Sequence, residues 1–221
     1  MKKLIYTVIL GGLLTLTLNS CGEKKEQKKE EKKTITQDTV IVEKTCTYSL
    51  DNESVKLNFT AFKYTEKAGV GGGFDTLEVS SFDEEKTTIS EALMNVKFSI
   101  VTGSTNTNNP DRDSKIKDSF FGSMKNSTEI TGYIESIRPD GEGVILISMN
   151  GEDVRGPFAW TYENGSFSLT ATVDVHNFAG ADALAALNGV CEDLHKGEDG
   201  LSILWPNVDV VVEATIKEIC E

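Results

Sequence analysis

The chain has 221 residues with 22 basic and 35 acidic side chains, which gives a net charge of −13. Such an acidic chain repels nucleic acid, and no basic patch in the sequence offsets that charge. Nucleic-acid binding is therefore excluded.

The first twenty residues have the pattern of a bacterial lipoprotein signal peptide. Two lysines precede an uncharged apolar stretch at residues 4–18, which is too short to span a bilayer comfortably. The stretch ends in Leu18-Asn19-Ser20-Cys21, which resembles the lipobox cut by the lipoprotein signal peptidase; an ordinary secretory signal with a chance cysteine is the alternative. We expect residues 1–20 to be removed and Cys21 to be acylated. More than one acyl chain gives durable membrane anchoring, since each buried methylene contributes about 0.8 kcal/mol.

The residues after Cys21 predict a tether and the membrane in which the protein is anchored. Gly22, where a sorting aspartate could stand, favours the outer membrane with the protein facing the periplasm. Residues 23–33 contain six lysines and four glutamates, a low-complexity composition with nothing to bury. We expect residues 21–45 to be a charged linker and residues 46–221 to be one domain of ordinary size. Without residues 1–33, which hold eight basic and four acidic residues, 14 basic and 31 acidic residues remain, a charge of −17.

Apolar and polar residues alternate from Tyr48 onward, which is typical of strands with one buried face. Eight strands are expected, near residues 55–61, 70–80, 96–100, 129–137, 143–149, 153–162, 167–175 and 208–216. Turn sequences such as Pro139-Asp140-Gly141 and Glu163-Asn164-Gly165 separate them and favour antiparallel hairpins. A closed barrel buries eight such faces and removes the exposed edges, whereas a sandwich is the alternative. An outer-membrane barrel fits poorly, because its apolar residues would face lipid and would need aromatic girdles.

Two short helices interrupt the strands. Around residues 110–121, Asn109 is suited to the N-cap and a proline follows it at the first helical position. The second helix is expected over residues 181–195. Its apolar residues share one face at spacings of three and four: Leu184, Leu187, Cys191 and Leu194. This places Cys191 toward the core and His195 off that face.

The sequence contains no catalytic motif, so we expect a binding protein rather than an enzyme. The glycine-rich run at residues 69–74 lacks the Lys-Ser/Thr of a phosphate loop and indicates a turn between strands. A zinc site would need two ligands besides Cys191 and His195, and we expect no metal. Catalysis through His176 or His195 is an alternative hypothesis, but no nucleophile-elbow sequence supports it.

Aromatic residues are spread over nearly every expected strand and over the first helix. An eight-stranded barrel can either fill its interior with such rings or hold one small ligand. Small residues lie among them and leave room beside the rings: Ala61, Gly72, Gly132, Ala171 and Ala214. A space lined only by carbon accepts an apolar chain. The sequence alone leaves a solid core and a ligand cavity both open.

Four segments, in this order, resemble the YceI family of lipocalin-like periplasmic barrels. In the first, Val55 to Lys63 form an aromatic–Lys strand that leads to Val70-x-Gly72-Gly73-Phe74. The second runs from Val96 through Asp111-Arg112-Asp113 to Phe120-Phe121, and the third combines Gly132 with the strand pair at 143–162. The fourth is Val173 to Phe178, in which Asn177 replaces the family's acid. The resemblance covers about residues 48–219 and implies a mainly β fold, a single antiparallel eight-stranded lipocalin-like barrel with two short helices. The second helix and Trp205-Pro206 look like a subgroup insertion.

The resemblance also implies that the barrel binds a long polyisoprenoid or a quinone-like lipid, with no cofactor other than that lipid. The side chains expected to line the ligand are Phe59, Phe62, Val70, Phe74, Val96, Phe98, Phe120, Phe121, Phe158, Trp160, Phe167, Phe178 and Trp205. Candidates for a polar rim are Lys63, Arg112, His176 and Asn177. The alternative function is a non-catalytic stress-protective or partner-binding envelope lipoprotein with a filled barrel. The oligomeric state stays open.

The closed barrel also suggests a disulfide. Three cysteines remain after Cys21 is acylated, and the envelope permits disulfides. The first and last strands of a closed antiparallel barrel are neighbours, which brings Cys46 and Cys220 to the same rim. We expect the pair Cys46–Cys220 with Cys191 as a buried thiol; Cys191–Cys220 is the alternative.

Overall fold

The computed structural model describes residues 44–81 and 84–221 of the chain. The expected signal peptide, Cys21 and nearly all of the linker lie outside the described residues. Contacts divide the chain into the units Met1–Val42 and Glu43–Glu221. Both clusters of core side chains belong to the second unit, so we expect it to fold on its own. None of the helices in the described ranges has both the length and the apolar character needed to cross a membrane.

Eleven strands in the described residues form one antiparallel sheet in the order β4-β5-β7-β8-β9-β10-β11-β2-β3-β6, with β1 paired to β11. They are β1 (Cys46–Leu50), β2 (Lys56–Lys63), β3 (Ala68–Phe74), β4 (Leu77–Ser80), β5 (Lys97–Val101), β6 (Thr105–Asn106), β7 (Glu129–Ile137), β8 (Glu142–Met149), β9 (Glu152–Glu163), β10 (Ser166–Asp174) and β11 (Leu204–Cys220). Asn-Gly pairs with positive φ form the two-residue turns between β8 and β9 and between β9 and β10, where that conformation matches the twist of a hairpin.

The two ends of this sheet meet, so the sheet curls into a barrel. Strands β3 and β4 are consecutive, and they pair with the consecutive strands β6 and β5, respectively. Across the junction the amide of Asp75 donates to the carbonyl of Ser104 at 2.9 Å, and the amide of Val101 donates to the carbonyl of Thr76 at 3.1 Å. The expected antiparallel barrel is therefore confirmed.

The strand count differs from the expected eight for local reasons. A break at Asp75 and Thr76 divides the strand expected near 70–80, and the 3-10 turn η2 (Thr102–Ser104) separates β5 from β6. β1 is an additional strand, paired with the last five residues of β11. The expectation of a turn at residues 69–74 is wrong, because this glycine-rich run forms most of β3 and pairs with β2.

The α-helices of the described residues are α1 (Ile89–Leu93), α2 (Pro110–Lys115), α3 (Ala181–Val190) and α4 (Glu192–His195). The side-chain oxygen of Asn109 accepts the amide of Arg112 at 3.1 Å and caps α2 as expected. The chain continues beyond Lys115 as a π-helical turn, η3 (Ile116–Phe120), and a 3-10 turn, η4 (Phe121–Ser123). Two further 3-10 turns are η1 (Asn52–Ser54) and η5 (Val175–Phe178).

The second expected helix is broken at Cys191, which separates α3 from α4. Cys191 is buried, as expected. Leu194 was expected on the buried face, but its side chain is 56% exposed. His195 was expected off that face, but it is buried. The backbone of Cys191 is not helical, so the helical spacing does not predict which side chains beyond it face the core.

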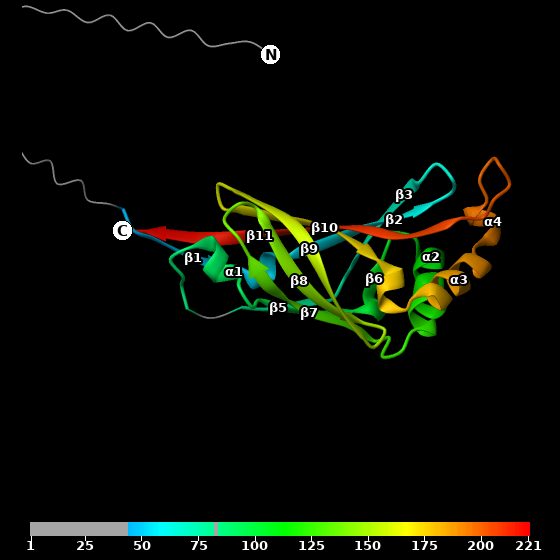
Figure 1. Ribbon diagram of the computed structural model, residues 1–221, viewed down its shortest axis with the longest axis horizontal. Coiled ribbons are helices and arrows are strands. Elements are labelled where there is room, and N and C mark those ends of the chain that lie inside the picture. The colour runs from blue at the N-terminus through cyan, green and yellow to red at the C-terminus, as the bar shows by residue number, and fades with distance from the viewer. Residues whose placement is uncertain (1–43, 82–83) are drawn as a thin grey trace, which may run out of the picture. The chain divides into compact units, whose positions relative to one another are not determined.

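The barrel has two different ends (Figure 1). At one end, α1 and β1 lie beside the last residues of β11, and a disulfide joins Cys46 to Cys220. We call this the disulfide end. At the other end lie α2, α3 and α4 (Figure 1); α3 contacts β11, and η3 contacts α3. We call this the α3 end. The pairing Cys46–Cys220 is as expected, and Cys191 is a free buried thiol.

Candidate functional site: an apolar cavity inside the barrel

A cavity of about 260 Å³ lies inside the barrel. All of its lining side chains are aliphatic, aromatic or methionine. It draws on both core clusters, with Leu93 and Leu169 from the cluster at the disulfide end and Phe121 and Val175 from the cluster at the α3 end. Its lining on β11 extends from Leu204 to Ala214, which corresponds to roughly 30 Å of extended strand. The cavity is therefore long, narrow and lined by carbon.

Strand alternation places the lining side chains. On β10, every second residue from Phe167 to Val173 lines the cavity, and on β2 the lining residues are Leu57, Phe59 and Ala61. The register aligns these rows across neighbouring strands, because Phe59 and Ala171 both pair with Val210. The polar residues between them face outward, since side chains on a strand alternate between the two faces.

Three glycines on the wall accommodate the rings of directly opposite residues. Gly72 pairs with Phe59, Gly132 with Phe98, and Gly143 with Phe158. A Cβ added to Gly132 would lie 2.5 Å from the Phe98 ring and 2.1 Å from the carbonyl oxygen of Leu146. The expected room beside the rings at Gly72 and Gly132 is thus filled by the rings, and the remaining space lies farther inside the barrel.

Most of the residues expected to line a ligand do line this cavity. They are Phe59, Phe74, Val96, Phe98, Phe120, Phe121, Phe167 and Trp205. The Trp205 ring is held in place by its indole N–H, which donates to the carbonyl of Tyr64 at 2.7 Å. The Lys67 ammonium lies 4.4 Å from the centre of the same ring.

Five of the expected residues lie outside the lining: Phe62, Val70, Phe158, Trp160 and Phe178. Phe62 follows the inward residue Ala61 on β2, so strand alternation turns it outward. Phe158 is buried against Gly143, and Phe178 is buried in η5 within the core cluster at the α3 end. Val70 is half-buried on β3 opposite Ala61.

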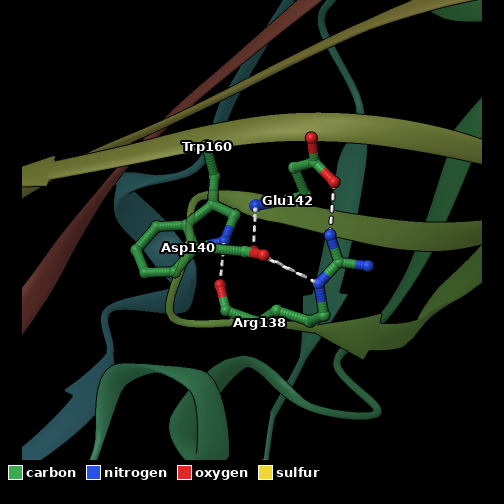
Figure 2. Close-up of polar contacts among 4 residues, drawn as sticks. All are labelled: Arg138, Asp140, Glu142 and Trp160. Atoms are coloured by element: carbon green, nitrogen blue, oxygen red, sulfur yellow. Dashed lines mark hydrogen bonds and ion pairs between the residues drawn. The ribbon is translucent and has the colours of Figure 1, made fainter. Parts of the chain in front are cut away.

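Trp160 does not line the cavity, and its indole is bound by the hairpin between β7 and β8. Figure 2 shows its indole N–H directed at the carbonyl of Arg138, at 3.0 Å. The Asp140 carboxylate accepts the guanidinium of Arg138 at 3.2 Å and the amide of Glu142 at 3.3 Å, while Arg138 also pairs with Glu142. The hydrogen bond from Arg138 lowers the pKa of the Asp140 carboxyl. This polar hairpin fixes Trp160 over the core cluster at the disulfide end.

The expected lining consisted almost entirely of aromatic residues, so it omitted the aliphatic side chains that make up much of the cavity wall. Among the missed side chains are Leu57, Ile100, Ile130, Ile147, Leu169, Leu184, Leu187, Val210 and Val212. Continuing the period-two pattern along each strand would have identified those on β2, β5, β10 and β11. No comparable pattern marks the helical contributors Leu184 and Leu187 as cavity residues rather than ordinary core.

The expected polar rim is dispersed. Lys63 is at the α3 end, where its ammonium donates to the carbonyl of Leu194 at 2.9 Å. Arg112 lies half-buried on α2. His176 and Asn177 are exposed in η5, and the Asp174 carboxylate lies 3.8 Å from the His176 ring. None of the four lines the cavity.

His195 is a buried polar residue that was not among the candidates for the polar rim. Its Nδ1 lies 2.8 Å from the side-chain oxygen of Asn188, and the Asn188 amide nitrogen faces the carbonyl of Ser202 at 3.4 Å. This orientation of Asn188 makes Nδ1 the donor. Burial lowers the pKa of His195, and the positive charges of Lys63 and Lys115 lower it further. The imidazole is therefore neutral at pH 7.

One group of possible metal ligands occurs in the described residues, at Cys46, Glu218 and Cys220. Both of its sulfur atoms belong to the disulfide, and a metal needs the thiolate form. This group therefore cannot hold an ion while the disulfide is intact.

Comparisons with known proteins agree with this geometry. The sequence pattern of the YceI-like domain matches residues 48–216. A polyisoprenoid-binding domain from Saccharophagus degradans superposes with a TM-score of 0.52 at 14% identity, covering 77% of this chain and 97% of that one. BcnA from Burkholderia cenocepacia superposes with a TM-score of 0.52 at 12% identity, covering 76% and 99%. At these identities the two structures show a shared fold. No curated protein matches the chain.

Proposed function

Because this chain belongs to the YceI-like domain family, we propose that it binds a long apolar lipid, a polyisoprenoid or quinone-like chain, inside its barrel. The observation that carries the proposal is the cavity wall, which contains no polar side chain. Transfer of such a chain from water is favourable by about 25 cal/mol for each Å² of apolar surface buried. The ligand in the name of the Saccharophagus degradans domain, a polyisoprenoid, has the same chemistry.

The shape of the cavity favours a single chain over a bulky ring system. Its volume of about 260 Å³ is just below the range of about 300–1,000 Å³ for small-molecule pockets. That volume is distributed along much of β11, so the space is narrow along its length. The chemistry to be performed is retention and release of a hydrocarbon chain rather than catalysis.

The proposal includes an envelope lipoprotein anchored through Cys21, in the outer membrane and facing the periplasm. Its support is the signal-like pattern of residues 1–20 and the lysine- and glutamate-rich tether. The alternative, a stress-protective or partner-binding lipoprotein, assumed a filled barrel, and the cavity weighs against it. Native mass spectrometry of protein purified from its own envelope should detect a long-chain adduct; consistent absence of one contradicts ligand carriage.

The direct test is titration of residues 43–221 with a C20 isoprenoid alcohol in detergent, followed by tryptophan fluorescence. Trp205 lines the cavity and Trp160 does not, so the signal should persist in Trp160→Phe and disappear in Trp205→Phe. Filling the cavity with Ala171→Phe should weaken binding at least about tenfold, because the new ring occupies the ligand's space. The matched control is Ala159→Phe, since Ala159 is exposed on β9. Equal binding by Ala171→Phe and the parent protein contradicts the proposal.

A further inference from the structure

The α3 end carries a group of exposed apolar side chains. Val190, Leu194 and Leu201 are 52%, 56% and 55% exposed, and we call them the tip patch. They make up three of the five large apolar side chains that are exposed in the described residues; the other two, Val211 and Ile219, lie on β11. Backbone hydrogen bonds order the segment that carries these side chains. The amide of Leu194 donates to the carbonyl of Cys191, and the amide of Gly197 donates to the carbonyl of Leu201. The patch is therefore part of a folded segment.

The tip patch follows, in the chain, the α3 residues that line the cavity. Leu184 and Leu187 on α3 line the cavity. Val190 follows Leu187 by three residues within α3, a spacing that keeps the two side chains near one face of the helix. Leu194 and Leu201 follow beyond the break at Cys191 and are exposed in the next segment of the chain. The apolar face of α3 thus begins at the cavity wall and ends at exposed Val190, directly before the segment that carries Leu194 and Leu201, at the end where Trp205 also lines the cavity.

We propose that the tip patch inserts into the surface of a lipid bilayer and brings the α3 end of the cavity to the acyl chains in which its ligand is dissolved. The proposal rests on the proposed lipid-binding function. A bilayer is the one surface that both accepts exposed leucine and valine side chains and stores long apolar molecules.

The size of the tip patch favours a bilayer over a protein partner. A stable protein interface buries about 800 Å² on each partner, and even a large aromatic side chain buries only about 150–250 Å². Three half-exposed aliphatic side chains provide far less than an interface needs. A shallow insertion below the lipid headgroups needs only a few such residues.

The charges around the tip patch indicate which bilayer it prefers. Lys63, whose ammonium donates to the Leu194 carbonyl, and Lys196 lie at the patch, together with the carboxylates of Glu192, Asp193 and Asp199. This mixture has no positive excess, so it does not attract anionic lipids. Burial of apolar side chains must drive the association, and neutral phosphatidylcholine should be bound at least as well as anionic lipid.

The tether is long enough for this orientation even though it joins the opposite end of the barrel. Residues 21–46 comprise 25 peptide steps, a reach of at most about 85 Å when fully extended. The longest strand, β11, has 17 residues, or roughly 57 Å of extended chain. A domain held at Cys46 can therefore turn its α3 end toward the membrane that holds Cys21.

The test is flotation of residues 43–221, without acyl chains, on phosphatidylcholine vesicles. We expect the parent protein to partition onto the vesicles and the double variant Leu194→Ser/Leu201→Ser to partition at least about fivefold less. Ile219→Ser is the matched control, because Ile219 is 54% exposed at the disulfide end; it should float like the parent. Raising the salt concentration should leave the partition unchanged, because charge does not drive it.

The proposal is overturned by no flotation of the parent, by equal flotation of the double variant, or by binding that is confined to anionic vesicles and abolished by salt. A concentration-dependent dimer that the double variant abolishes also overturns it, by making the patch a contact between copies of this chain. Uptake of the isoprenoid alcohol from detergent separates this proposal from the proposed function. Uptake without vesicle flotation refutes the docking surface alone, whereas absence of uptake by a folded parent protein refutes the proposed function.

Discussion

The two ends of the barrel are closed by different structures. At the disulfide end, a covalent bond joins the first and last strands, and Leu93 of α1 is 1% exposed over a continuous core. At the α3 end, short helices, a π turn and a buried histidine close the barrel, while Leu194 stays 56% exposed. Short helices with few buried apolar residues open at lower free energy than a packed core does. One end therefore maintains the barrel, and the other is suited to admit a ligand.

The sharpest test of this comparison makes the same substitution at both ends. Leu93→Ala should lower the free energy of unfolding by about 2–5 kcal/mol, because it removes a fully buried side chain. Leu194→Ala should change it by less than about 0.5 kcal/mol, because Leu194 is exposed. Urea unfolding of the two variants measures both values. Similar losses at the two positions would mean that the ends contribute equally to stability.

The disulfide should contribute the next largest effect. Its cysteines are 174 residues apart in sequence, so the bond removes much of the freedom of the unfolded chain. The double variant Cys46→Ser/Cys220→Ser should lose about 2–4 kcal/mol of unfolding free energy in urea. The parent protein measured under reducing conditions should show the same loss. A smaller loss than that of Gly143→Ala would indicate that β1 is held to β11 by its hydrogen bonds alone.

The glycine–ring pairs of the wall predict an intermediate effect. A Cβ on Gly143 would lie 2.2 Å from the Phe158 ring and 2.6 Å from the carbonyl oxygen of Ser136. Gly143→Ala should therefore destabilise the protein by about 1–3 kcal/mol, since the ring and the backbone must both shift. Gly156→Ala on β9 is the control, because nothing lies within 4 Å of its added Cβ; it should be neutral or slightly stabilising. Equal effects of the two alanines would contradict this account of the wall.

The smallest effect concerns pH and the α3 end. Burial holds the pKa of folded His195 below its ordinary value of 6.5, which we take as the value in the unfolded chain. Above pH 6.5 the ring is neutral in both states, and below it the unfolded chain binds a proton that the folded protein does not. Stability contributed by neutral His195 is thus lost as the pH falls below 6.5. His195→Gln should reduce the fall in unfolding free energy between pH 7.5 and 5.5 by up to about 1 kcal/mol.

The matched control for this measurement is His176→Gln, which leaves His195 in place and should keep the pH dependence of the parent. A parent protein whose stability does not fall over this interval would show that His195 is protonated without cost. In that case the α3 end is more open to water than the buried position of the ring indicates.

The alternation of apolar residues and the turn sequences between them predicted antiparallel strands with one buried face, but they left a sandwich open. That pattern is local, because each strand needs only its own residues to present one face. The barrel and most of its aromatic lining followed from the resemblance to the YceI family. The disulfide followed from closure of the barrel. The division of the expected strand near 70–80 did not, since it arises where one segment changes partner from β6 to β5.

Only the tertiary structure decided which aromatic rings border the cavity and where the second helix stops packing against the core. Phe59, Phe98 and Phe158 each pack on a glycine directly opposite, yet Phe59 and Phe98 line the cavity and Phe158 does not. Leu187 and Leu194 share one helical pattern, but the break at Cys191 leaves one in the cavity wall and the other exposed. Periodicity specifies which face a side chain occupies; the volume opposite that face depends on strands and helices distant in the sequence.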